Sequence, residues 1–216
     1  MSDMESQSED NETVEKDEGT PSPTEQPIQW YINSTHWAIV MSRDVLAALA
    51  IVAVIGGVLV GITGVWPPLV AVESGSMEPN IQEGDLVLVV DNERFVHDAA
   101  TDDGIVTRED GEDAGHERFG ASGSVIVFQP TDESDTPVIH RVERYVEAGN
   151  DWTDGLNVSC EEVENCEADR SGYITKGDAN DQYDQARSYE IVEKDQIRGK
   201  ALIRIPYLGR VRLLFN

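Results

Sequence analysis

The most extended hydrophobic segment of the chain covers residues 45–66 and contains no charged side chain. As an α-helix its 22 residues would rise about 33 Å, which is enough to cross the hydrocarbon core of a bilayer. A cleaved secretory signal does not fit, because the 44 residues before this segment are acidic rather than short and basic. Pro67 and Pro68 are expected to stop the helix. The pattern therefore predicts one retained transmembrane helix.

Beyond this segment the pattern changes to short apolar runs rich in Val and Ile, separated by Gly, Pro, Asn or Asp. The runs cover residues 84–90, 124–128, 138–146, 172–175 and 199–205. No stretch after residue 66 keeps a helical period over ten or more residues. We therefore predict a mainly β fold, in which one amino-terminal transmembrane helix precedes a partly closed antiparallel β domain.

Polar segments complete the predicted organisation. Residues 1–27 hold nine acids, one Lys and no aromatic side chain, so we expect a disordered tail. Trp30, Tyr31 and Trp37 favour a place at the membrane interface, and a short amphipathic helix packed elsewhere is the alternative. The predicted domains are an acidic tail with an aromatic segment (1–44), the membrane helix (45–66), and a β-rich domain (67–216) whose acidic insertions, 91–120 and 149–170, are expected to be surface loops.

The chain is strongly acidic, with a formal net charge of −26 and a pI near 4.2. This excess argues against nucleic-acid binding, because phosphate contacts need clustered Lys and Arg. Acid spread over tail, insertions and domain suits concentrated salt, where screening removes the self-repulsion. We therefore expect a solvated acidic surface and a halophilic source.

The charges beside the hydrophobic segment predict its orientation. Arg43 precedes the segment, and no Lys or Arg follows it until Arg94. We expect a single-pass protein of the cell membrane. Because positive residues favour the cytoplasmic side, its amino terminus would be cytoplasmic and its carboxyl-terminal domain extracytoplasmic.

The second insertion holds both cysteines of the chain, Cys160 and Cys166. It lacks the neighbouring His or further Cys that a closed zinc site needs. A disulfide and two free thiols both remain open. Asn157 begins an Asn-Val-Ser triplet, a glycosylation acceptor pattern that is common by chance.

A serine that hydrolyses an amide needs a base for its proton, and the base needs an orienting group. Ser74, Gly75 and Ser76 form a turn-like cluster soon after the membrane segment, although a plain turn would have the same composition. Among the four His, His140 lies within a strand-like run, where a general base and a structural histidine are both reasonable. His36 precedes the membrane segment.

The remaining titratable candidates are less distinctive. His97 and His116 lie in the first insertion, where we expect them to be solvated. Acids are too abundant for an orienting carboxylate to be chosen by counting. Asp178 and Asp184 stand out because they surround a Gly-containing turn after a strand, although an Asx turn would explain Asp178 equally well.

Five motifs occur in a defined order behind the membrane segment. They are Ser74-Gly75-Ser76-Met77-Glu78-Pro79, Gly84-Asp85-Leu86-Val87, Ile139-His140-Arg141, Lys176-Gly177-Asp178-Ala179-Asn180 with Asp184, and Gly199-Lys200 with Ile205-Pro206-Tyr207-Leu208-Gly209. Together they resemble type I signal peptidases of the archaeal and endoplasmic-reticulum branch. The resemblance covers residues 45–215 without the two insertions. Each motif alone is modest, whereas five in order are highly specific.

The resemblance implies a role for each matching residue. Ser76 would be the nucleophile and His140 the general base. Asp184 would orient His140. Asp178 matches a second aspartate of the site, and two roles stay open for it: holding the loop or tuning the histidine. The Ser74 hydroxyl and the backbone N–H of Ser76 would bind the oxyanion.

Two features separate this chain from parts of the family. The bacterial branch uses a lysine as base, but the nearest lysine after the His140 strand is Lys176, within the acid motif, so a Ser–Lys dyad is not supported. Ser124 stands where the family often has Asp, and Ala179 where Asn is usual. These departures concern local loop geometry and leave the reaction unchanged.

The implied function is that of a membrane-anchored serine endopeptidase, which cleaves amino-terminal signal peptides from exported preproteins. An extended substrate would add to the sheet as a strand. Its expected contacts are Val72, Glu73, Leu86, Val87 and Leu88. Partners would be the preproteins and the lipid bilayer, with the protein-export channel as a further candidate. No cofactor or metal is implied.

Two alternatives belong to other classes. A catalytically inactive, membrane-anchored binding or scaffold protein on the same fold would be marked by loss of Ser76, His140 or Asp184. A self-cleaving, repressor-type protease would use a Ser–Lys dyad. The membrane segment and His140 argue against the second alternative.

Overall fold

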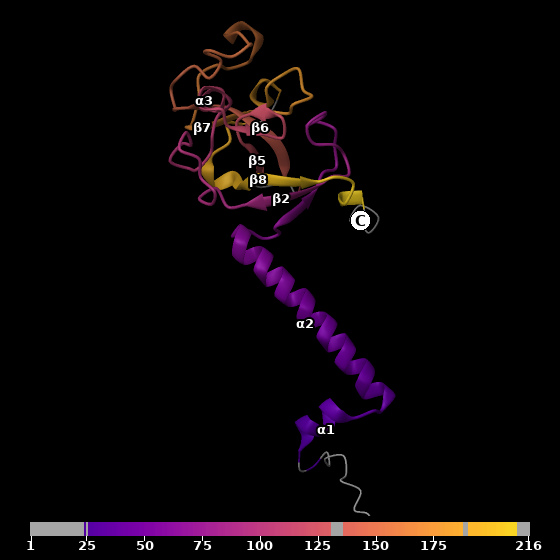
Figure 1. The fold of residues 1–216 in the computed structure, drawn as a ribbon. Coiled ribbons are helices and arrows are strands. Elements are labelled where there is room, and N and C mark those ends of the chain that lie inside the picture. The colour runs from indigo at the N-terminus through magenta and orange to yellow at the C-terminus, as the bar shows by residue number, and fades with distance from the viewer. Residues whose placement is uncertain (1–23, 25, 131–135, 188–189, 211–216) are drawn as a thin grey trace, which may run out of the picture. The chain divides into compact units, whose positions relative to one another are not determined.

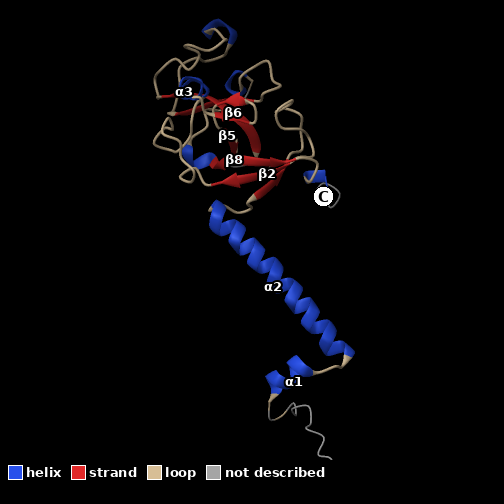
Figure 2. Cartoon of the chain, viewed as in Figure 1, coloured by secondary structure: helices blue, strands red, loops and turns tan. Residues whose placement is uncertain are grey.

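The computed structural model describes residues 24, 26–130, 136–187 and 190–210 of the chain (Figure 1). It divides into two compact units, Met1–Ile55 and Gly56–Asn216, which we describe separately. Most of the predicted acidic tail lies outside the described residues. The described strands all belong to the second unit, with long loops between them (Figure 2).

The first unit contains a short helix followed by most of a long one. Trp30 and Tyr31 lie in α1 (Pro27–Asn33), so the predicted aromatic segment is helical. The hydroxyl oxygens of Tyr31 and Ser42 are 2.7 Å apart, and Arg43 donates hydrogen bonds to the carbonyl oxygens at the end of α1. These contacts pack α1 against the first turns of α2 (Trp37–Thr63).

Helix α2 is long and apolar enough to cross a membrane, and no other helix of the described residues is. It begins at residue 37 rather than 45, because Ser42, Arg43 and Asp44 continue the helix beyond its uncharged part. It ends at residue 63, not at the prolines. Gly64, with φ of 77°, turns the backbone out of the helix, and its N–H donates to the carbonyl of Val60.

A charged side chain completes this helix end within the second unit. Arg94 Nη1 donates to the carbonyl oxygens of Gly61 and Ile62, at 2.7 and 2.8 Å. The backbone N–H of Asp91 donates to the carbonyl of Thr63 at 2.8 Å. These bonds satisfy carbonyl groups that the last helical turn leaves without partners, and they place a positive charge at the negative end of the helix.

The second unit is built around one antiparallel sheet of six strands, in the order β1-β2-β8-β5-β6-β7. The strands are β1 (Leu69–Ala71), β2 (Leu86–Val90), β5 (Val125–Phe128), β6 (Val138–Val146), β7 (Gly172–Lys176) and β8 (Ile197–Ile205). Each of the five predicted runs became a strand, and the predicted fold class is confirmed. Within this sheet, only the three-residue strand β1 was not among the predicted runs.

Smaller elements connect these strands. They are α3 (Arg108–Ala114), the hairpin of β3 (Glu117–Arg118) and β4 (Ala121–Ser122), and the 3-10 turns η1 (Cys160–Glu162), η2 (Asp184–Ala186) and η3 (Lys194–Gln196). Thr107 caps α3, since its hydroxyl accepts from the backbone N–H of Asp110.

One apolar cluster holds the serine segment on the sheet. Met77 and Ile81 are fully buried and pack with side chains from three strands, including Val87, Val125 and Ala201. Burying a side chain as large as Met contributes roughly 1.5–3 kcal/mol. The residue beside Ser76 is thus part of the core, which fixes the turn that carries Ser76.

The two insertions are exposed or half-buried over most of their length, but each also contributes a few buried side chains. Ile105 is fully buried in the first, where it packs with residues of β5, β6 and β7. His116 is also buried rather than solvated, and burial, with nearby Arg118, His97 and Lys200, lowers its pKa. Apolar side chains from both insertions are therefore part of the core.

The second insertion is closed by a disulfide between Cys160 and Cys166. Trp152 is 3% exposed and packs with Ile174 and Tyr183. Its ring N–H donates to a loop carbonyl, and its backbone N–H donates to the carbonyl of Cys166. The disulfide and this buried ring fold the acidic loop back on the sheet.

The side of β2 and β8 that faces away from the core is apolar as well. Ile203 pairs with Leu88 and Ile205 pairs with Leu86, on the face opposite the core residue Val87. Ile203 is 52% exposed and Ile205 is 39% exposed. An antiparallel sheet with one solvated face normally carries polar residues there.

Candidate active site

Ser76 lies on a turn between β1 and β2 that the backbone fixes from both sides. The N–H of Glu78 donates to the carbonyl of Gly75, and the N–H of Ile81 donates to the carbonyl of Met77. Because the next side chain, Met77, is in the core, the Ser76 side chain is left at the surface of the turn.

His140 points at Ser76 from β6. Its Nε2 lies 3.0 Å from Ser76 Oγ, and its Nδ1 lies 2.6 Å from Asp184 Oδ2. His140 is 6% exposed and Asp184, the first residue of η2, is 1% exposed. The three side chains therefore form one hydrogen-bonded path, which begins at the surface and ends in the interior.

This arrangement can activate a hydroxyl. When Asp184 accepts the Nδ1–H of His140, the imidazole presents an unprotonated Nε2 to the Ser76 hydroxyl. That nitrogen can then take the hydroxyl proton as Oγ attacks an electrophile. Ser74 Oγ lies 3.4 Å from Ser76 Oγ, so a second hydroxyl stands beside the attacking atom.

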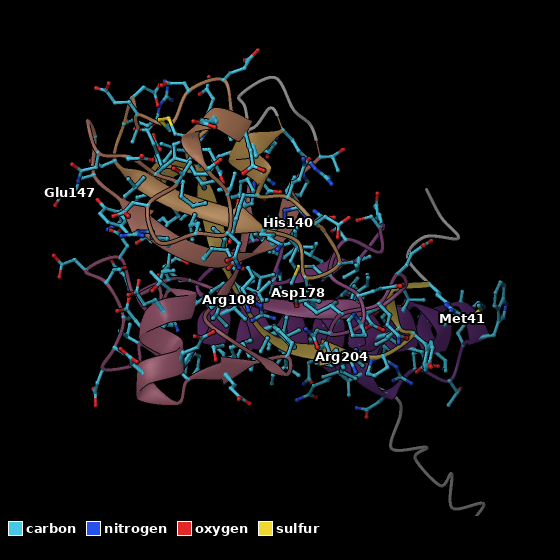
Figure 3. The ribbon with its side chains drawn as sticks, turned by 90° about the horizontal axis from the view of Figure 1, so that it is seen from above. Met41, Arg108, His140, Glu147, Asp178 and Arg204 are labelled. Atoms are coloured by element: carbon cyan, nitrogen blue, oxygen red, sulfur yellow. A yellow bond between two sulfur atoms is a disulfide. The ribbon has the colours of Figure 1, made fainter. Side chains whose placement is uncertain are left out.

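The side-chain contacts of Asp178 are with an arginine and an asparagine, which fits the loop-holding role of the two predicted for it. Arg141 donates to both of its carboxylate oxygens, at 2.8 and 2.7 Å, and Asn80 Nδ2 donates to Oδ2 at 2.8 Å. Figure 3 labels Asp178 and His140. The geometry directs Asp178 toward Arg141 and Asn80 rather than toward the imidazole, so a bond-making role is not supported.

Arg141 extends this contact into a network. Its guanidinium is fully buried, and Nη1 donates to carbonyl oxygens of the β3–β4 hairpin, those of Arg118, Ala121 and Gly123, at 3.0 to 3.1 Å. The sequence analysis placed Arg141 in a motif but assigned it no role. Its signal was an Arg within the apolar run of β6, because a buried guanidinium needs carboxylate and carbonyl partners.

The turn that follows β7 contacts the Ser76 backbone directly. The N–H of Ala179 donates to the carbonyl of Ser76 at 2.9 Å. A Cβ added at Gly177 would lie 2.6 Å from the same carbonyl oxygen, so the close approach of the two backbones requires glycine there. The departure at Ala179 leaves this backbone contact in place.

A cavity of about 380 Å³ opens over Ser76 and His140. One wall is formed by β1 and the residues after it, including Val72 and Glu73, and the other by the start of β6. Strand β1 is the end of the sheet, and β6 pairs with β7 only from Arg141 onward. Two strand edges along this cavity therefore lack a strand partner among the residues that the structure describes.

The expectation for Leu86, Val87 and Leu88 has to be corrected. Their strand, β2, has β1 on one side and β8 on the other, so its backbone groups are already paired. Leu86 and Val87 are buried, and none of the three lines the cavity. Val72 and Glu73, the other two predicted substrate contacts, do line the cavity.

The other candidate bases and ligands lie in different surroundings. Lys176 Nζ is 5.1 Å from the centre of the Tyr183 ring, in a cation–π contact. The ring centres of His97 and His116 lie 4.7 Å apart in the first insertion, with the two rings tilted by 56°. Among the described residues, the one group with metal-ligand spacing is Asp151 with two cysteines, whose sulfurs are joined in the disulfide.

Comparison with known proteins gives distant relatives of one kind, and no family model matches the chain. The chain is 26% identical over 152 residues to the signal peptidase complex catalytic subunit SEC11 of Metarhizium acridum, covering 69% of this chain and 64% of the relative. It is 28% identical over 161 residues to the signal peptidase complex catalytic subunit SEC11C of Homo sapiens, covering 73% and 62%. The chain thus spans less than two thirds of these relatives. At this identity, the similarity supports a relationship to the endoplasmic-reticulum type of signal peptidase I.

Proposed function

We propose that this chain is a membrane-anchored serine endopeptidase, which removes amino-terminal signal peptides from exported preproteins. The observation that carries the proposal is the path from Ser76 through His140 to Asp184, with distances of 3.0 and 2.6 Å, beside a cavity of about 380 Å³. The names of the distant relatives support the same reaction class.

In the proposed reaction, His140 Nε2 takes the hydroxyl proton while Ser76 Oγ attacks the scissile carbonyl carbon. The oxyanion accepts hydrogen bonds from the Ser74 hydroxyl and the backbone N–H of Ser76. His140 then gives the proton to the leaving amine, and the acyl-enzyme remains. A water molecule then loses a proton to His140 as its oxygen attacks the acyl carbon. The bond from that carbon to Ser76 Oγ breaks, and His140 returns the proton to Oγ, which releases the carboxylic acid product. Asp184 stabilises the imidazolium in both steps.

Asp178 has a positioning role in this proposal. Asp178 bonds to Asn80, in the segment after Ser76, and to Arg141, next to His140. These bonds connect the segment that follows the nucleophile to the strand that carries the base. This division of roles assigns bond-making to Ser76 and His140, and orientation of the base to Asp184.

The substrate would lie as an extended strand between β1 and the start of β6, with Val72 and Glu73 beside it. Backbone hydrogen bonds to both edges would hold any sequence, and the apolar walls of the cavity would favour small or apolar side chains. The protein-export channel is a candidate partner.

Residues 67–216 form the catalytic domain in this proposal, and residues 45–66 span the membrane. Arg43 before the helix favours a cytoplasmic amino terminus and an extracytoplasmic domain. The exposed face of Ile203 and Ile205 would rest on the bilayer. The acid excess supports a source that grows in concentrated salt.

The test is cleavage of a precursor with a small-residue signal peptide, by the full chain in detergent and high salt. Ser76→Ala, His140→Ala and Asp184→Ala are expected to lose cleavage by several orders of magnitude while their circular dichroism stays that of wild type. Cleavage that survives Ser76→Ala would place the nucleophile elsewhere. A folded wild-type chain that does not cleave would favour a scaffold protein.

A further inference from the structure

A second buried donor acts on the carboxylate that orients His140. Asp184 Oδ2 accepts a hydrogen bond from Thr175 Oγ1 at 2.7 Å, in addition to the one from His140 at 2.6 Å. Thr175 is 0% exposed. An ionised carboxylate only accepts hydrogen bonds, so the hydroxyl is the donor. We propose that Thr175 is a positioning residue of the peptidase site, which holds Asp184 and through it His140; this inference rests on the proposed function.

The strand itself does not need a hydroxyl at this position. Thr175 lies in β7 opposite Val142 of β6, which is fully buried. A valine has nearly the same shape, is equally suited to a strand, and buries no polar group. A hydroxyl in such a place costs free energy unless it is hydrogen-bonded. Its partner, Asp184, is therefore the reason for a threonine here.

Asp184 depends on few donors for its position. Its second oxygen, Oδ1, has no hydrogen-bond partner among the described residues. Without Thr175, the buried carboxylate would keep the bond to His140 on Oδ2 and lose its second side-chain donor there. It could then rotate, and its charge would be less stabilised. The imidazole would lose the fixed orientation that proton transfer from Ser76 needs.

A separate contact keeps the surrounding turn in place. The backbone N–H of Thr175 donates to Gln185 Oε1 at 3.0 Å, and Gln185 Nε2 donates to the carbonyl of Glu190 at 3.1 Å. These bonds connect η2 to β7 without using the Thr175 hydroxyl. Removal of that hydroxyl is therefore expected to change the reaction step and to leave the fold and substrate binding unchanged.

The experiment compares Thr175→Val with Thr175→Ser in the full chain, with a signal-peptide precursor as substrate. We expect Thr175→Val to lower kcat on the order of ten- to hundredfold with KM unchanged, and Thr175→Ser to retain most of kcat. Thr153→Val is the matched control. Thr153 Oγ1 donates to Asp151 Oδ1 at 2.6 Å, so this variant loses the same kind of bond outside the site and should keep the wild-type kcat.

Each outcome separates the inference from the proposed function. Wild-type kcat in Thr175→Val, or a Thr175→Ser variant that is equally slow, overturns the role of Thr175 while Ser76-dependent cleavage still supports the peptidase. If Thr175→Val does not fold, the comparison is made between Thr175→Ser and Thr175→Ala, because serine and alanine differ only by the hydroxyl. Equal kcat values in these two variants would overturn the role of the Thr175 hydroxyl. Cleavage that is independent of Ser76 overturns the proposed function itself.

Discussion

Buried charged residues make the strictest demands on this site. Arg141 is 0% exposed, and its bonds to Asp178 and to the β3–β4 hairpin occupy its guanidinium. Asp178 in turn accepts from Asn80. A buried charge is stable only while its partners are present, so this network holds the segment after Ser76, the His140 strand and the hairpin in one arrangement.

Replacing Arg141 with Ala is expected to lower the free energy of unfolding by about 3–5 kcal/mol, because the Asp178 carboxylate would stay buried without its cation. Guanidinium unfolding followed by circular dichroism measures the change. Arg170→Ala is the control, since the carboxylate partners of Arg170 are at least 43% exposed, and its expected cost is below about 1 kcal/mol. Equal losses in the two variants would contradict the importance of burial.

Chemistry decided which site residues could be predicted. Ser76, His140 and Asp184 have side chains whose reactivity limits the roles they can take, and the structure brings these three together. Asp178 was predicted to belong to the same site, because a sequence motif does not show whether its carboxylate contacts the histidine or, as in the structure, Arg141. Thr175 gave no signal, since threonine is an ordinary strand residue and its partner lies across a turn.

At the scale of elements, the turn after β7 supports the nucleophile. Ala179 donates to the Ser76 carbonyl, and Gly177 leaves no room for a side chain in front of it. The two segments are about a hundred residues apart in the chain, yet their backbones are in contact. The position of Ser76 Oγ therefore depends on β7 as much as on the turn that carries it.

Gly177→Ala is expected to displace Ser76 and to lower kcat on the order of tenfold or more, because small misplacements of reacting atoms are costly. Steady-state cleavage of the precursor measures it. Gly57→Ala is the control, because nothing lies within 4 Å of a Cβ added there and alanine favours a helix. Wild-type kcat in Gly177→Ala would show that the turn can adjust.

Element types were easier to predict than element ends. The five apolar runs became strands because each is bounded by residues that favour turns. Strand β1 has only three residues, too few for a visible alternation. Helix α2 extends past its apolar part at one end and stops at Gly64 at the other, because backbone conformation rather than hydrophobicity sets both ends. The first insertion contains Ile105, whose burial depends on a sheet that pairs distant segments.

At the scale of the whole molecule, net charge sets the conditions for stability. With a formal charge of −26, self-repulsion opposes the compact state, and added salt screens it. We expect Tm to rise by at least about 10 °C between 0.1 and 2 M sodium chloride. Thermal unfolding followed by circular dichroism measures this, with the same ionic strengths of potassium chloride as the control. A Tm independent of salt would contradict a halophilic origin.

The apolar outer face of β2 and β8 predicts contact with lipid. Ile203→Cys, labelled with a fluorophore in nanodiscs, is expected to be quenched by spin-labelled lipids, because Ile203 is exposed on that face. Glu147→Cys, in the exposed turn between β6 and the second insertion, is the matched control and should not be quenched. The native cysteines are joined to each other, so each variant carries one free thiol. Equal quenching at both positions would contradict a defined lipid-facing side.

The bond between Cys160 and Cys166 also bears on topology. Such bonds persist in oxidising compartments and are rare in a reducing cytosol. We therefore expect an extracytoplasmic domain on a second ground, which is independent of Arg43 and the flanking charges. The two sulfurs therefore report on which side of the membrane the domain lies. In protein taken from intact cells, they should react with maleimide only after reduction. A chain of the opposite orientation would have free thiols and would react without reduction.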